Sequence, residues 1–253
     1  MDFLVFTIQV FEREFFFSKH LVISTGTVLR SDTIPPSGSC IVVVGACIDR
    51  QVPFEVWGPP GTRSMMDYLQ KAFVFDIHTR RDIDEKYSKV GISVLSHDVK
   101  EGIVFEKNGV KVTTFLVDHG PVKPAFGYRV DFGGHSVTLS GDTRFSENLI
   151  KHSQGVDVVI HETVDGDALR TNPGNRTKEQ VENIIGHHTT LDQTGVVFSR
   201  IKPRLAVYSH ILGAPEQLVT GTRKTYSGPL IVGEDLMTIE IGDSVEVRRF
   251  QGR

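Results

Sequence analysis

Four short polar segments of this 253-residue chain carry side chains suited to metal-dependent hydrolysis. They are Asp118-His119, Ser140-Gly141-Asp142-Thr143, His188-Thr189-Thr190 and Ser209-His210. Imidazole nitrogen and carboxylate oxygen are common zinc ligands. A carboxylate can also bridge two ions, which then hold the attacking and leaving oxygens of a hydrolysis. The segments therefore predict part of a two-metal hydrolase site, with Asp142 as the bridging residue and His119 and His210 as further ligands.

Each predicted ligand has an ordinary structural explanation as well. Asp142 follows an apolar run and Gly141, so its carboxylate could simply stabilise a turn. His119 and His210 each end an expected strand, where a histidine is often exposed or hydrogen-bonded in the core. The prediction therefore depends on the combination of segments and their order, because no single residue is specific.

His188 and Glu162 are candidates for proton transfer and for its support. His188 lies just before an expected helix, where it could give a proton to a leaving alkoxide or contact a phosphate. Glu162 follows a strand expected to end at His161, and it could orient a metal-binding or catalytic histidine. The alternatives are a solvent-facing pair with His187 and a surface carboxylate, respectively.

The rest of the chain predicts strands and helices in a layered α/β arrangement. Asn108-Gly109 and Gly133-Gly134 are hairpin signals, and Thr190 with Gln193 forms a capping box. The expected strands are 3–11, 21–29, 41–44, 54–57, 92–95, 103–106, 110–117, 126–132, 136–140, 156–161, 205–209, 230–232 and 237–241, and the expected helices are 62–73, 146–153, 178–185, 190–201 and one from 215. Early hairpins followed by strand–helix–strand units are typical of mixed α/β folds.

Composition narrows the function classes. The formal net charge is −3, so a nucleic-acid contact would depend on a local basic patch. Cys40 and Cys47 are too few for a disulfide framework and are expected as free thiols, in keeping with a cytoplasmic location. Asp2 stands where a signal peptide would carry positive charge, and no apolar run is long enough to predict a membrane span.

The ordered motifs resemble the metallo-β-lactamase superfamily, within it the ribonuclease Z branch and its arylsulfatase-like relatives. The resemblance extends from about Phe54 to Met237 and includes Phe54–Thr62, Asp118–Pro121, Phe126–Arg129, Ser140–Arg144 and Ile160–Glu162. It implies an αββα sandwich of two mixed sheets with outer helices, truncated in its N-terminal half. It also implies a single domain over residues 21–253 that follows a divergent segment, 1–20.

The resemblance implies a role for each candidate residue. His119 would bind one metal ion, His210 the other and Asp142 both, while His188 would be the catalytic or phosphate-contacting residue and Glu162 would support it. The metals would be zinc, with manganese as an alternative. The substrate would be a phosphodiester, either an RNA 3′ end such as that of precursor transfer RNA or a smaller ester.

One departure from the family affects its chemistry. The family's His-x-His-x-Asp-His run is absent, because no two histidines of this chain lie two residues apart. The junction near residues 46–52 is where an internal deletion is expected. Each ion would keep two protein ligands, one of them shared, whereas catalytic zinc usually has three. His97 and His78, expected in a loop and beyond a helix end, are poor replacements.

The incomplete ligand set leaves two alternatives open. The first is a catalytically inactive scaffold or interaction protein of the same fold. The second is a lactonase- or arylsulfatase-like hydrolase. The basic, glycine-rich arm of ribonuclease Z proteins is not evident, since Arg170–Lys178 holds three basic residues, which favours a smaller ester. The truncation would expose apolar surface and a strand edge, which a second copy could cover in a homodimer.

Overall fold

The computed structural model describes residues 4–8 and 51–249, which belong to two compact units. The larger unit lies within Met1–Ser18 and Glu101–Arg253, and the smaller within Lys19–Lys100. The expected strands 21–29 and 41–44, both cysteines and most of segment 1–20 lie outside the described residues, as does most of the 46–52 junction. The single domain over 21–253 and the deletion stay predictions.

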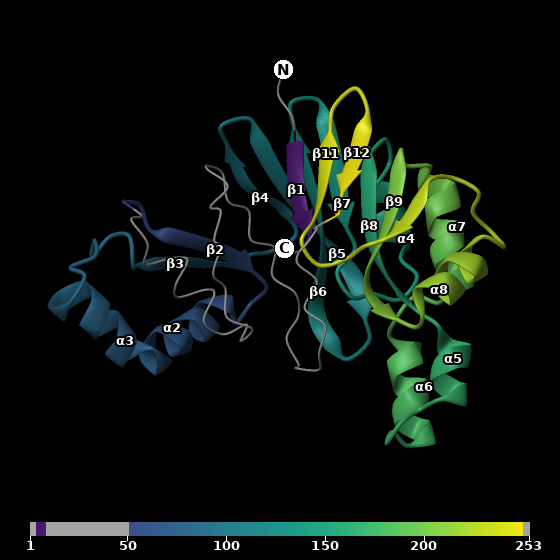
Figure 1. The fold of residues 1–253 in the computed structure, drawn as a ribbon, viewed down its shortest axis with the longest axis horizontal. Helices are drawn as coiled ribbons and strands as arrows, with labels where there is room; N and C mark the ends of the chain where they lie inside the picture. Colours follow the sequence, from purple (N-terminus) through teal and green to yellow (C-terminus); the bar gives the residue numbers. More distant parts are fainter. Residues whose placement is uncertain (1–3, 9–50, 250–253) are drawn as a thin grey trace. The chain divides into compact units, whose positions relative to one another are not determined.

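A mixed seven-stranded sheet is the centre of the larger unit (Figure 1). Its order is β10-β9-β8-β7-β6-β5-β4, with bounds β4 Gly102–Lys107, β5 Val110–His119, β6 Val122–Phe132, β7 His135–Leu139, β8 Val158–Val164, β9 Leu205–Leu212 and β10 Leu230–Val232. Strands β4 to β7 pair antiparallel, and β7 to β10 pair parallel. Asn108 and Gly109 have φ of +52° and +79°, and Gly133 and Gly134 have +58° and +84°. These values fit two-residue hairpin turns, as predicted.

A second, antiparallel sheet packs against one face of the first. It contains β1 (Leu4–Ile8), β11 (Met237–Ile241) and β12 (Val245–Arg248), in the order β1-β11-β12. Alternate residues of β11 are buried, as the two-residue period of a strand requires. These buried residues pack with Val158 and Val207 of the large sheet.

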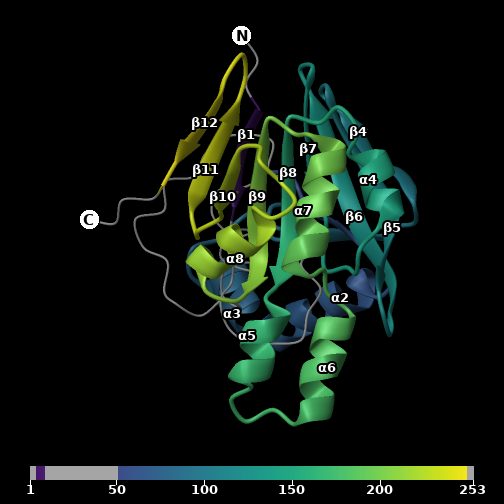
Figure 2. The same ribbon diagram turned by 90° about the vertical axis from the view of Figure 1, so that its right-hand side faces the viewer.

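Helices cover the opposite face of the seven-stranded sheet (Figure 2). They are α4 (Glu147–His152), α7 (Leu191–Ile201) and α8 (Pro215–Thr222). Phe198 of α7 is fully buried and contacts Tyr208 of β9, with ring centroids 5.7 Å apart. The order helix layer, mixed sheet, second sheet confirms the predicted mixed α/β class, although the second sheet is antiparallel over the described residues and not mixed as predicted.

Helix starts in the larger unit follow local sequence signals. The Ser146 hydroxyl accepts the Leu149 N–H at the start of α4, and the Thr190 N–H donates to the Gln193 side chain at the start of α7. A further pair, α5 (Gly166–Thr171) and α6 (Lys178–Gly186), precedes the loop that carries His187 and His188. Short α5 was not predicted, nor was β12. None of the described helices is long and apolar enough to cross a membrane.

The smaller unit contains β2 (Phe54–Gly58) and β3 (Val94–Asp98), which pair parallel, with α2 (Thr62–Ala72), α3 (Val74–His78) and a π-helix, η1 (Thr79–Ile83). The N-cap of α2 is Gly61, whose φ is +102°. The loop expected at His97 is wrong, whereas His78 lies beyond the end of α2 as expected, although in a further helix that was not predicted. His97 lies within β3, where its ring stacks on that of Trp57 at 5.1 Å, and His78 is the last residue of α3.

Candidate metal centre

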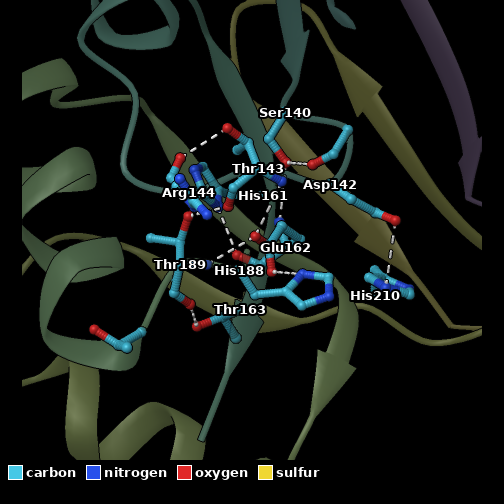
Figure 3. Close-up of polar contacts among 12 residues, drawn as sticks. Ser140, Asp142, Thr143, Arg144, His161, Glu162, Thr163, His188, Thr189 and His210 are labelled. Atoms are coloured by element: carbon cyan, nitrogen blue, oxygen red, sulfur yellow. Dashed lines mark hydrogen bonds and ion pairs between the residues drawn. The ribbon is translucent and has the colours of Figure 1, made fainter. Parts of the chain in front are cut away.

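The predicted site residues lie at one edge of the seven-stranded sheet, where Figure 3 shows Asp142, Glu162, His188 and His210 close together. His119 is the last residue of β5, Asp142 lies in the loop after β7, and Glu162 and His210 lie in β8 and β9. Strands β5, β7, β8 and β9 run in the same direction, because β6 pairs antiparallel with both β5 and β7. Their carboxyl ends therefore share an edge, to which the loop between α6 and α7 adds His188.

Backbone geometry next to β7 places Asp142. Gly141 has φ of +61°, which favours glycine, and a Cβ atom there would lie 2.5 Å from the Phe126 carbonyl oxygen. The chain can therefore pass close to β6 before it reaches Asp142. Gly141 therefore gives the chain a sharp exit from β7.

A β-bulge places His210. His161 of β8 pairs with Tyr208 of β9, but Thr163, two residues further along β8, pairs with Ile211, three residues further along β9. Two residues of β9 therefore face one residue of β8, and His210 takes φ of +52°. Bulges and positive φ values of this kind often direct a side chain at a functional site. The prediction that the strand ends at His210 is wrong, since β9 continues to Leu212.

Glu162 is buried and holds three groups in position. Its Oε1 accepts the N–H groups of Thr143 and Thr189 at 3.2 and 2.9 Å, and its Oε2 lies 3.2 Å from His188 Nδ1. The residue is 2% exposed, so the surface-carboxylate alternative is wrong. Burial raises the pKa of Glu162 well above its usual value and lowers the pKa of His188.

Asp142, His119 and His210 offer atoms that suit a metal ion. Asp142 Oδ2 lies 3.6 Å from His210 Nε2. Within residues 4–8 and 51–249, Asp142 Oδ1 and His119 Nε2 are buried without a hydrogen-bond partner. Such atoms are costly to bury unsatisfied. Two imidazole nitrogens and a carboxylate form a donor set that zinc prefers, so the residues present fit the ion that the sequence predicts.

His187 is a further candidate metal ligand. From the sequence it was expected only as a partner of His188 in a solvent-facing pair. The ligand atoms of His119, His187 and His188 all lie within 4.8 Å of one another. The ring of His187 is 4.9 Å from those of both His119 and His188, centroid to centroid. The adjacent His187-His188 pair was the one signal in the sequence that pointed to it.

Arg144 connects the loops around this cluster. Its Nε donates to the Gly186 carbonyl at 2.5 Å, and its Nη1 lies 3.4 Å from Asp118 Oδ2. These contacts join the loop after β7 to the residue before His187 and to the residue before His119. About half of the Arg144 side chain is exposed, so the guanidinium also presents positive charge beside the site.

A cavity of about 750 Å³ begins at His210 and continues between β9, β10 and α8. Its charged lining comprises Glu216, Glu234, Asp235 and Arg249. Arg249 forms an ion pair with Glu234, which leaves the lining acidic overall. The volume is in the range of small-molecule sites.

Comparisons with known proteins agree on one family. Residues 46–211 match the family model of the beta-lactamase superfamily domain. Ribonuclease Z of Mycobacterium marinum is 29% identical over 227 residues, which cover 85% of this chain and 78% of the relative. A putative ribonuclease Z of Mycobacterium tuberculosis is 28% identical over 224 residues, 85% and 97% of the two chains. Among solved structures, the metallo-beta-lactamase fold protein YhfI from Bacillus subtilis aligns with a TM-score of 0.54 at 13% identity, covering 79% of this chain and 70% of that one.

Proposed function

This chain belongs to the metallo-β-lactamase superfamily, and from that premise we propose that it is a metal-dependent hydrolase of a phosphodiester or a related ester. One observation carries the proposal: the buried, unpartnered Nε2 of His119 and Oδ1 of Asp142, which the sheet topology brings to the same edge. Such an arrangement of unsatisfied donors and acceptors is expensive unless a ligand engages it.

His119, Asp142 and His210 would hold the metal in this proposal. Oδ2 of Asp142 lies near His210, and its Oδ1 is buried without a hydrogen-bond partner among the described residues. The two oxygens could therefore each bind a metal ion. Held there, zinc would supply Lewis-acid polarisation of the scissile bond, and manganese is the alternative ion.

His188 and Glu162 would handle the proton. Glu162 is fixed by two backbone N–H groups and lies beside His188 Nδ1, so in this proposal it accepts the Nδ1–H and leaves Nε2 for the transferred proton. In that tautomer His188 can hold a proton for the leaving alkoxide when it is protonated. Positioned acid–base groups of this kind contribute about 10²–10⁴-fold in rate.

The substrate class follows from the relatives and from charge. Relatives named ribonuclease Z favour a phosphodiester, including an RNA 3′ end. The acidic cavity beside His210 and the net charge of −3 disfavour a long RNA, so a small ester or a short RNA end is the better candidate. A lactone or sulfate ester is the alternative substrate, and a homodimer and a cytoplasmic location stay predictions.

A second candidate function is a non-catalytic scaffold or interaction protein. It is favoured by the absence of any His-x-His pair in the 253 residues, since this pair would supply ligands to the first metal. Under this alternative the fold persists while the metal centre is incomplete.

Turnover by the purified full chain separates the two functions. We expect the zinc-loaded protein to hydrolyse bis(p-nitrophenyl) phosphate and to lose this activity in the variant His210→Gln. His78→Gln, which replaces an exposed histidine of the smaller unit, is the matched control and should leave the rate unchanged. If neither zinc nor manganese supports turnover of this ester, of a lactone, of an aryl sulfate or of a precursor transfer RNA, the scaffold function replaces the hydrolase.

A further inference from the structure

We propose that His119, His187 and His188 form a three-histidine zinc site, which can hold one ion without the ligands of the absent His-x-His-x-Asp-His run. This trio differs from the predicted set of His119, Asp142 and His210. The inference concerns metal binding alone and stands whether or not the chain hydrolyses an ester.

The geometry of the trio is close to that of a zinc site. One ligand atom from each residue lies within 4.8 Å of the other two. Nitrogens bound to a tetrahedral zinc at 2.0–2.1 Å are about 3.3 Å apart. The imidazoles therefore need to approach by at most about 1.5 Å, which small side-chain rotations can supply. His119 Nε2 is buried and has no hydrogen-bond partner among the described residues, so binding costs it no existing contact.

The surroundings of His188 match those of a metal ligand. Histidines that bind metals usually donate their other ring N–H to a carboxylate or a carbonyl. His188 Nδ1 lies 3.2 Å from Oε2 of Glu162, whose Oε1 is fixed by two backbone N–H groups. Because Nδ1 is engaged by Glu162, Nε2 is the atom of His188 that would bind the ion.

The position of His187 is also supported from outside the trio. Arg144 holds the carbonyl of Gly186, the residue before His187, and its Nη1 lies near Asp118, the residue before His119. A Cβ atom added at Gly120 would lie 3.2 Å from His187 Cβ, so the backbone of the His119 loop packs directly on His187. The two loops that supply ligands are thus held together.

Three imidazoles and one open position make up a known type of catalytic zinc site. Asp142 lies near enough to influence the electrostatics of all three histidines, and its negative charge favours a cation there. With zinc on Nε2, His188 is no longer the proton donor. His188 therefore either binds zinc or donates a proton, and an experiment can distinguish these two roles.

Zinc affinity of the full chain tests the proposal without any activity measurement. Competition with a chelating dye would give the affinity of the wild type and of the variants His187→Gln, His210→Gln and His135→Gln. Loss of an outer-shell partner alone typically costs about 10–100-fold in affinity. We therefore expect zinc affinity to fall at least about 100-fold in His187→Gln, further than in His210→Gln, and to change little in the control His135→Gln.

Cobalt substitution gives a second readout. Cobalt(II) in a tetrahedral nitrogen site should give intense visible absorption in the wild type, and this absorption should be lost in His187→Gln while urea unfolding of the metal-free variant is unchanged. The proposal is overturned if His187→Gln binds zinc as tightly as the wild type, if zinc affinity falls further in His210→Gln than in His187→Gln, or if the wild type binds none. A bound ion without ester turnover would overturn the proposed function and leave the site intact.

Discussion

Replacement of Glu162 by alanine and by glutamine separates its structural contribution from its effect on His188. Alanine removes the acceptor of three buried donors: the N–H groups of Thr143 and Thr189 and His188 Nδ1–H. Glutamine keeps an oxygen for the two backbone N–H groups, and its amide can donate to His188 Nδ1. The two variants therefore differ in how many buried groups they leave unsatisfied.

The expected magnitudes follow from that count. Each buried donor left without an acceptor costs about 1–3 kcal/mol, and a water molecule filling the space would recover part of this. Glu162→Ala should therefore lower the free energy of unfolding by roughly 3 kcal/mol or more. Glu162→Gln should stay within about 1 kcal/mol of the wild type, since it also removes a carboxylate that is costly to bury.

Both variants should weaken zinc binding, because neither accepts the Nδ1–H of His188. An outer-shell loss of this kind lowers metal affinity by about 10–100-fold. Urea unfolding of the chelator-treated chain would measure stability, and dye competition would measure affinity. If alanine and glutamine differ in unfolding free energy by less than about 0.5 kcal/mol, the size of ordinary surface effects, the hydrogen-bond account of Glu162 is wrong.

Three further perturbations test the fold and the site. Burial lowers the pKa of His161 to about 4, below its value in the unfolded chain. The stability that comes from keeping His161 neutral is therefore complete above about pH 6.5 and is lost as the pH falls to about 4. Urea unfolding should show that the free energy of unfolding falls on acidification by up to roughly 3 kcal/mol less in His161→Leu than in the wild type. Gly195→Ala should lower the free energy of unfolding by about 1–3 kcal/mol, because the added methyl group would overlap the Thr225 hydroxyl. In the control Gly186→Ala the added methyl group has no atom within 4 Å, so no such loss is expected. Asp142→Asn should abolish phosphodiester turnover of the zinc-loaded chain at unchanged unfolding free energy; retained turnover would remove Asp142 from the proposed mechanism.

Local signals were sufficient for much of the fold. The turns Asn108-Gly109 and Gly133-Gly134, the capping box that opens α7 and the alternation of β11 all act over a few residues, and each has the structure predicted for it. Polar residues explain why one strand was predicted too short. Strand β8 continues through Glu162 and Thr163 to Val164, because its neighbours bury and satisfy polar side chains that otherwise suggest a strand end.

The sequence by itself determined which residue types were available: His119, Asp142, His188 and His210, in an order that indicates the superfamily. Only the tertiary structure decided what surrounds them. Burial of Glu162, the bulge that turns His210 and the approach of His187 to His119 all depend on pairing between strands and loops distant in the chain. Such contacts leave no periodic or local pattern, since each is set by the register of one strand against another.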